Sequence, residues 1–269
     1  MVDFKSIDLS GKYNFHSHTQ FCDGRARMEE FAKAAAEQGF THYGFSPHSP
    51  IPFASPCNMS VDDVPLYLDE VARLKTIYAD RVNLYASMEI DYVEGWGPAH
   101  PYFQQLPLDY RIGSVHFIPS FDNDKEFIDI DGSFENFKVK MEKYFYNDIK
   151  RVVESFYQQS MHLVEDGHFD IIGHFDKIAY NASCYSPGIE NERWYEGLVM
   201  RLFEAIMDHH YIIEINTKAW EKQQRFFPHH RFFELLKKFN APVLFNSDAH
   251  FPDLINAGRD EAISMFNNS

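Results

Sequence analysis

Short apolar runs recur along the chain, separated by stretches with helical periodicity or by turn residues. Seven runs predict strands, at residues 12–16, 42–46, 82–90, 109–117, 169–173, 211–216 and 243–246. Helices are predicted at residues 28–38, 62–78, 191–208, 232–239 and 260–266, with a long, mostly helical stretch at 133–165. The aromatic side chains of that stretch recur at a spacing typical of a core-facing stripe. Strands that alternate with helices predict parallel βαβ units.

Candidate metal ligands cluster at the end of the first predicted strand. Residues i and i+2 of a strand share a face, so His16 and His18 project together. Two neutral imidazoles make half of a divalent-metal site, and Asp23 could add a harder ligand from the following loop. An exposed strand that happens to end in two histidines is the simpler alternative for this motif alone.

Similar residues follow the other predicted strands, and this recurrence favours the metal site. They are His48, Glu89, His116, His174, Asp248 and His250. Barrel enzymes place their chemistry at the C-terminal ends of their strands, whereas an open doubly wound sheet uses one topological switch point. Because most strands contribute here, we predict an α/β fold with a closed, barrel-like arrangement of the seven strands, in a single domain over residues 1–269.

Composition limits the partners of the chain. A formal net charge of −15 argues against a nucleic-acid surface, because phosphate backbones are bound by clusters of Lys and Arg. It does not exclude a small phosphorylated substrate, since bound cations reverse the local field. No apolar stretch approaches the length of a membrane span, and no secretory signal is visible. Three widely spaced cysteines form no disulfide framework. We therefore expect a cytoplasmic protein with no membrane partner; its oligomeric state stays open.

Six segments appear in an order that resembles a known family. They are residues 16–18 (HSH), 46–49 (SPHS), 87–92 (SMEIDY), 112–117 (IGSVHF), 172–176 (IGHFD) and 246–250 (NSDAH). Together they resemble the polymerase and histidinol phosphatase (PHP) superfamily and, within it, the histidinol-phosphate phosphatases. The likeness runs from about Tyr13 to the final predicted helix.

The resemblance implies a distorted (β/α)7 TIM-like barrel with a trinuclear metal centre. One ion would be held by His16, His18, Glu89 and Asp248. A second would share Glu89 and add His116 and His174, and a third would take Asp23, His48 and His250. Some superfamily members have histidine where this chain has Asp23. Zinc, manganese and iron all suit such mixed imidazole and carboxylate ligands.

Position and chemistry make further residues candidates for catalysis and substrate binding. Glu89 and Asp248 would act in catalysis, and Asp176 would either orient His174 or meet the substrate. Candidates for the substrate pocket are Arg25, Lys218 and Lys222 for the phosphate, Asp91 for the far end of the substrate, and His229. Family members often read Asn-Thr-Ser-Gly and then arginine where this chain reads NTKAWEK at 216–222, so the phosphate-binding cation has moved. Segment 227–231 (FPHHR) is also richer in histidine and cations than the usual Tyr-Pro turn.

The implied activity is metal-dependent hydrolysis of L-histidinol phosphate to L-histidinol and phosphate, a step of histidine biosynthesis. Metal ions suit this chemistry because they polarise phosphoryl oxygens and stabilise the attacking and leaving oxygens. One alternative is a PHP-type phosphoesterase for another small phosphoester, such as a nucleotide or sugar phosphate. Another is a catalytically silent metal-binding module, which the complete set of nine ligand positions disfavours.

Overall fold

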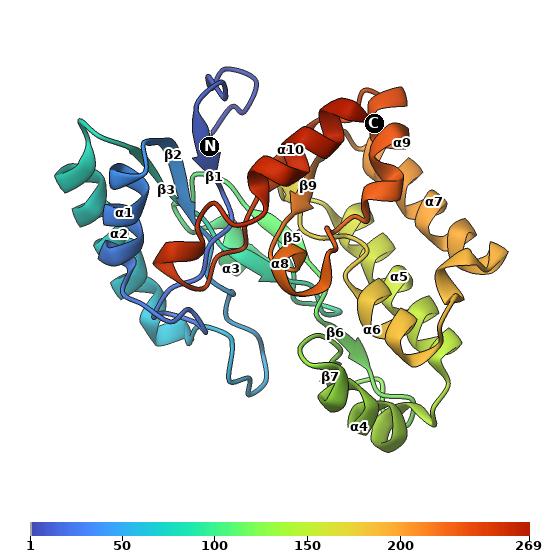
Figure 1. The fold of residues 1–269 in the computed structure, drawn as a ribbon. Coiled ribbons are helices and arrows are strands. Elements are labelled where there is room, and N and C mark those ends of the chain that lie inside the picture. The colour runs from blue at the N-terminus through green and yellow to red at the C-terminus, as the bar shows by residue number, and fades with distance from the viewer. Residues whose placement is uncertain (1) are drawn as a thin grey trace.

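The computed structural model describes residues 2–269, in which parallel strands form a distorted barrel with helices packed outside it (Figure 1). The parallel strands are β1 (Lys12–Asn14), β2 (Phe40–Phe45), β3 (Asn83–Ala86), β4 (Glu89–Asp91), β5 (Ile112–Ser114), β8 (Ile171–Ile172), β9 (Ile212–Asn216) and β10 (Val243–Asn246). They form two sheets, in the orders β1-β2-β3 and β10-β9-β8-β5-β4. The α/β class and the parallel strands predicted from the sequence are confirmed.

Two junctions join these sheets into a ring. β3 and β4 are the two halves of the strand predicted at 82–90, interrupted at Ser87 and Met88. Here the Ser87 N–H donates to Phe45 O at 2.9 Å, and the Ile112 N–H donates to Met88 O at 3.1 Å. On the other side the His18 N–H donates to Ala249 O at 2.8 Å, just beyond β1 and β10. These bonds close the predicted seven-stranded barrel.

Helices cover the outside of this barrel (Figure 1). They are α1 (Met28–Glu37), α2 (Val64–Tyr78), α3 (Pro101–Gln104), α4 (Phe134–Phe145), α5 (Ile149–Asp166), α6 (Ile178–Tyr185), α7 (Arg193–Asp208), α8 (Trp220–Gln223), α9 (Phe233–Lys238) and α10 (Arg259–Asn268), with short 3₁₀ turns η1 (Val61–Asp63), η2 (Ile189–Asn191), η3 (His230–Phe232) and η4 (Pro252–Leu254). Within residues 2–269, no helix combines the length and apolar character that crossing a membrane requires.

Aromatic side chains fill the barrel interior below the strand ends. Phe15 is fully buried and packs edge-on against Tyr110 at a ring-centroid distance of 5.6 Å. The Tyr110 hydroxyl donates to the Phe15 carbonyl. Gly44 of β2 permits this packing, because a Cβ at that position would lie 1.9 Å from Tyr110 Oη. The floor under the strand ends is therefore apolar and closely packed.

Several elements differ from the sequence prediction. The mostly helical stretch at 133–165 is divided into α4 and α5, because Tyr146 and Asn147 adopt positive φ angles of 52° and 58°. Its aromatic residues Phe137, Phe145 and Phe156 are buried, so the stripe faces the core as predicted.

An antiparallel hairpin of β6 (Phe117–Pro119) and β7 (Phe127–Asp129) was not predicted. The extent of the domain, residues 1–269, stays a prediction.

Candidate metal centre

The structure gathers all nine predicted metal ligands at the C-terminal ends of the strands. We call this set the ligand cluster: His16, His18, Asp23, His48, Glu89, His116, His174, Asp248 and His250. Most of them lie in β4 or within four residues of the end of a parallel strand, and Asp23 comes from the loop between β1 and α1. The strand ladder therefore fixes the backbones of most of these residues.

Glu89 lies at the centre of the cluster and is fully buried. Its Oε2 lies 3.2 Å from His16 Nε2 and 3.1 Å from His48 Nδ1. Its Oε1 lies 2.8 Å from His174 Nε2 and 3.6 Å from His116 Nε2. His18 Nε2 also lies 3.5 Å from Oε2, so each carboxylate oxygen faces a different set of imidazoles, an arrangement suited to a carboxylate shared between two ions.

Asp248 occupies a neighbouring position beside the first two histidines. Its Oδ1 lies 3.0 Å from His18 Nε2 and 3.5 Å from His250 Nδ1. His16 Nε2 and His18 Nε2 are 3.2 Å apart. These nitrogen and oxygen atoms converge on one point, as ligands of a common ion would.

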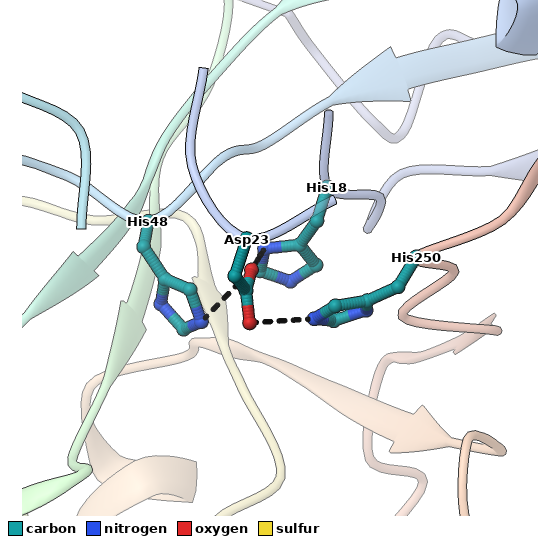
Figure 2. A group of neighbouring side chains, drawn as sticks. All are labelled: His18, Asp23, His48 and His250. Carbon is teal, nitrogen blue, oxygen red and sulfur yellow. Dashed lines mark hydrogen bonds and ion pairs between the residues drawn. The ribbon is translucent and has the colours of Figure 1, made fainter. Parts of the chain in front are cut away.

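Asp23 joins three imidazoles at the edge of the cluster (Figure 2). Its Oδ2 lies 3.2 Å from His250 Nε2, and its Oδ1 lies 3.5 Å from His18 Nδ1 and 4.0 Å from His48 Nε2. This group contains the predicted set Asp23, His48 and His250, with His18 in addition.

Three overlapping groups have ligand atoms that all lie within 4.8 Å of one another. They are His18–Asp23–His48–His250, His16–His18–Asp248 and His48–Glu89–His116. His18 and His48 each belong to two groups, whereas the prediction gave each of them to one ion. The overlap arises because an imidazole presents two nitrogens on opposite sides of its ring.

Unsatisfied atoms and backbone strain indicate that this cluster fits divalent cations. Asp23 Oδ1, His48 Nδ1 and Glu89 Oε2 are buried and make no hydrogen bond within residues 2–269. A buried carboxylate oxygen without a hydrogen bond is unfavourable unless a cation compensates it. His174 and Asp248 adopt positive φ angles of 22° and 49°, a strained conformation that is concentrated at functional sites.

The charges within the cluster are strongly coupled. Burial raises the pKa of Glu89, but His16, His116 and His48 outweigh it and hold that pKa well below its usual range. Burial and then His250 and His48 lower the pKa of His18 well below its ordinary value. Glu89 is therefore an anion and His18 a neutral imidazole, the forms in which both side chains bind metals. Burial lowers the pKa values of His16 and His116, but neighbouring carboxylates outweigh it and raise them, so these two imidazoles release a proton when they bind a metal.

Glu214 is a buried residue that the sequence analysis missed. Its Oε1 lies 2.7 Å from His16 Nδ1, and its Oε2 accepts a bond of 3.1 Å from the backbone N–H of His174. Asn216 and Asn246 donate to the same carboxylate. Glu214 thus directs His16 Nε2 toward the cluster. Polar residues 214 and 216 share a face of an otherwise apolar strand, and this pattern was the available signal.

Asp91 and Asp176 have partners other than those predicted. Asp91 Oδ1 lies 2.6 Å from His116 Nδ1, so this carboxylate orients a ligand of the cluster. Asp176 Oδ2 accepts from the His229 N–H at 2.9 Å and from Arg225 at 3.5 Å. Among the contacts within residues 2–269, none joins Asp176 to the His174 ring, so the predicted orientation of His174 by Asp176 is wrong. A catalytic role for Asp176 stays a prediction.

A cavity of about 660 Å³ opens over the ligand cluster. Of the predicted substrate residues, Asp91, Lys218 and Lys222 line it. Lys218 Nζ lies 3.3 Å from Asp248 Oδ1, and 3.3 Å from His250 Nε2.

Within residues 2–269, the lining of this cavity does not include Arg25 or His229, which were also predicted to contact the substrate. Arg25 is exposed, and its backbone N–H donates to His250 O at 2.8 Å; its role as a phosphate ligand stays a prediction.

A barrel with a buried cluster of imidazoles and carboxylates at its strand ends defines the class of metal-binding (β/α) barrel proteins. A family model described as the PHP domain matches residues 14–218. The chain belongs to the PHP family, as the resemblance implied.

Known relatives carry a consistent name. The chain is 27% identical over 252 residues to a Schizosaccharomyces pombe protein named "Probable histidinol-phosphatase", covering 88% of this chain and 80% of the relative. It is 26% identical over 264 residues to the histidinol-phosphatase of Bacillus subtilis, covering 89% and 93%. A crystal structure of histidinol phosphate phosphatase from Lactococcus lactis, complexed with Zn, L-histidinol and phosphate, superposes with a TM-score of 0.73 at 18% identity and covers 96% and 93% of the two chains. The relatives therefore cover most of this chain.

Proposed function

We propose that the protein is a histidinol phosphatase, a phosphoric monoester hydrolase that converts L-histidinol phosphate to L-histidinol and phosphate. The observation that carries this proposal is the ligand cluster, whose nine side chains meet at one end of a cavity that also holds Lys218. The names of the relatives support the substrate. Histidine biosynthesis and a cytoplasmic location are part of the same proposal.

The ligand cluster would hold divalent ions, which we propose to be three zinc, manganese or iron ions. When bound, such ions supply electrophilic stabilisation of phosphoryl oxygens and an activated water. Glu89 contributes an anion with one oxygen toward each of two groups of imidazoles, and Asp248 contributes another beside His18. Glu214 and Asp91 hold the imidazoles of His16 and His116 in the orientations that expose Nε2.

The cations of the cavity would bind the phosphate. The ammonium of Lys218 lies beside Asp248 at the edge of the cluster, where it can donate to a phosphoryl oxygen. Lys222 lines the same cavity and is the second candidate. Asp91 is engaged by His116 and by Asn58, whose amide donates to it at 2.8 Å, so its proposed contact with the substrate is secondary to orienting His116.

Phosphate release from a panel of esters tests the proposal. Metal-loaded protein is incubated with L-histidinol phosphate, a nucleotide, a sugar phosphate, p-nitrophenyl phosphate and a phosphodiester. We expect the highest kcat/KM for L-histidinol phosphate. A higher value for the nucleotide or sugar phosphate would favour the alternative phosphoesterase, and no release from any ester would favour a silent metal-binding module.

Elemental analysis of active protein tests the number of ions. We expect close to three divalent ions per chain, because nine ligands exceed the needs of one tetrahedral or octahedral ion. Fully active protein with one ion or fewer would contradict the trinuclear centre.

A further inference from the structure

The cavity contains an ion pair that is separate from the candidate metal ligands and from Lys218 and Lys222. Lys177 Nζ lies 3.4 Å from Asp131 Oδ2, and both residues line the cavity over the ligand cluster. Lys177 lies at the start of α6, and Asp131 lies two residues after β7. The Lys177 side chain is only 10% exposed, whereas that of Lys218 is 38% exposed. The pair thus places a nearly buried ammonium beside a carboxylate inside the cavity.

Hydrogen bonds fix this pair relative to the ligand cluster. The Lys177 N–H donates to the carbonyl of His174 at 2.8 Å, and the Ile130 N–H donates to the carbonyl of His116 at 2.9 Å. The Asn181 amide donates to Ile130 O at 3.2 Å and ties the segment before Asp131 to α6. Lys177 is therefore anchored to one candidate metal ligand by its own backbone N–H, and Asp131 is anchored to another through its neighbour Ile130.

The surroundings of the pair have unused hydrogen-bonding capacity. An ammonium has three donors, and within residues 2–269 only Asp131 forms an ion pair with that of Lys177. Asn181 is 4% exposed and lines the same cavity, yet its Oδ1 has no hydrogen-bond partner among the described residues. Burial lowers the pKa of Lys177, but Asp131, Asp248 and Glu89 outweigh it and raise that pKa. The ammonium is therefore charged and lies within the field of the cluster.

We propose that substrate binding exchanges this ion pair, with Lys177 donating to a phosphoryl oxygen while Asp131 and Asn181 Oδ1 accept from a substrate ammonium. This inference rests on the proposed function. In L-histidinol phosphate the phosphate ester and the ammonium are carried by adjacent carbons, so two opposite charges lie a short distance apart. A lysine and an aspartate already in contact present the complementary charges at a similarly short separation. Each charge that the exchange releases gains a new partner, which limits the desolvation penalty.

A second ion pair in the same cavity provides a matched control. Lys140 Nζ lies 2.8 Å from Asp129 Oδ2, and both residues line the cavity. Their side chains are 23% and 42% exposed, more than those of Lys177 and Asp131 at 10% and 33%. The control variants Asp129→Asn and Lys140→Gln remove the same charges from a more solvated pair.

Substrate selectivity tests the carboxylate of the pair. We expect Asp131→Asn to lower kcat/KM for L-histidinol phosphate about tenfold or more, while p-nitrophenyl phosphate, which has no ammonium, changes by less than about threefold. Inhibition by the product L-histidinol should weaken to a similar degree, and inhibition by inorganic phosphate should not weaken. A merely structural role would affect both substrates alike. Equal losses for the two substrates, or the same selectivity change in Asp129→Asn, would overturn the assignment.

Phosphate binding tests the ammonium independently of substrate identity. Calorimetry with inorganic phosphate and metal-loaded protein should show about tenfold or more weaker binding in Lys177→Gln, and little change in Lys140→Gln. Equal phosphate affinity in Lys177→Gln and the wild type would overturn the role of Lys177. If the wild type does not prefer L-histidinol phosphate, the proposed function fails, and this binding measurement still decides whether Lys177 is a phosphate ligand.

Two conservative variants test the same assignment with less risk of misfolding. Lys177→Arg and Asp131→Glu keep the charges but shift their positions, and thermal unfolding checks that they fold. We expect Asp131→Glu to reduce the preference for L-histidinol phosphate over p-nitrophenyl phosphate at least about threefold, and Lys177→Arg to weaken phosphate binding by a similar factor. Wild-type values in both variants would contradict the exchange.

Discussion

The ligand cluster and the wall of the cavity are built in different ways. The cluster stands mainly on strand ends, and Glu89 at its centre is 1% exposed. The cavity wall is formed mainly by side chains from segments 53–58, 127–132, 177–181 and 218–223, which lie mainly in loops, the β6–β7 hairpin and short helices. Its charged side chains are more open, with Lys218 at 38% exposure.

This difference separates the two tasks of the site. Parallel strands hold the metal ligands through a continuous backbone ladder, so their geometry is preorganised. The segments between the strands carry the groups that would contact a substrate, and such segments can change without disturbing the barrel. We therefore expect changes in the cluster to abolish turnover of all substrates, and changes in the wall to cause smaller losses, which at Asp131 depend on the substrate.

Glu89→Gln should have the largest effect. The amide keeps the shape of the side chain but removes the anion at the centre of the cluster, so we expect turnover to fall about a thousandfold or more for every ester. Circular dichroism should remain that of the folded protein. Glu94→Gln, at an exposed position five residues away, is the control. Near-normal turnover in Glu89→Gln would show that Glu89 has only a structural role.

Glu214→Gln tests whether Glu214 orients His16 for metal binding. We expect metal affinity to fall about ten- to a hundredfold, because the bond that orients His16 weakens. Competition with a chelator measures this loss, and excess metal should restore most of the turnover. A loss of turnover that excess metal does not restore would show that Glu214 acts in the reaction itself.

Lys218→Gln tests whether the lysines of the cavity wall bind the phosphate of the substrate. Loss of a charge-assisted contact to phosphate should lower kcat/KM about tenfold, with a smaller loss in Lys222→Gln, because Lys218 already lies 3.3 Å from Asp248. Both variants are compared on L-histidinol phosphate and p-nitrophenyl phosphate. A larger loss in Lys222→Gln would reverse the order of the two cations.

His229→Gln should have the smallest effect, on stability. Burial, and then the charge of Arg225, lowers the pKa of His229 to about 4, below its ordinary value near 6.5. As pH falls through this window, the unfolded chain takes up a proton that the folded chain does not, so folding loses stability. The free energy of unfolding of the wild type should therefore fall relative to His229→Gln by about 1 kcal/mol between pH 7 and pH 5. Urea unfolding measures this difference, and a difference independent of pH would contradict the lowered pKa.

The β6–β7 hairpin illustrates what the apolar pattern could not predict. Strand β6 begins directly after His116, so its apolar residues merge with the predicted strand at 109–117. The two strands are distinguished only by their partners: β5 pairs with β4 and β8, whereas β6 turns away to pair with β7. Pairing is a tertiary property, and period-two alternation contains no information about it.

Asp176 and Glu214 show the same limit for single residues. Proximity in sequence predicted that Asp176 would either orient His174 or meet the substrate, but the chain turns into α6 and directs Asp176 toward Arg225 and His229. Glu214, forty residues from His174, accepts the backbone N–H of that histidine instead. Buried carboxylates find partners across the barrel, and only the closed ring determines which.

The sequence by itself determined the positions of the ligand cluster, because parallel strands bring their C-terminal ends to one edge and most of the ligands lie at those ends. Only the tertiary structure decided which side chains share an ion group, which acid orients each imidazole, and which cations line the cavity. Those choices depend on side-chain direction and on contacts between distant segments, such as that of Lys177, just before α6, with Asp131, just after β7.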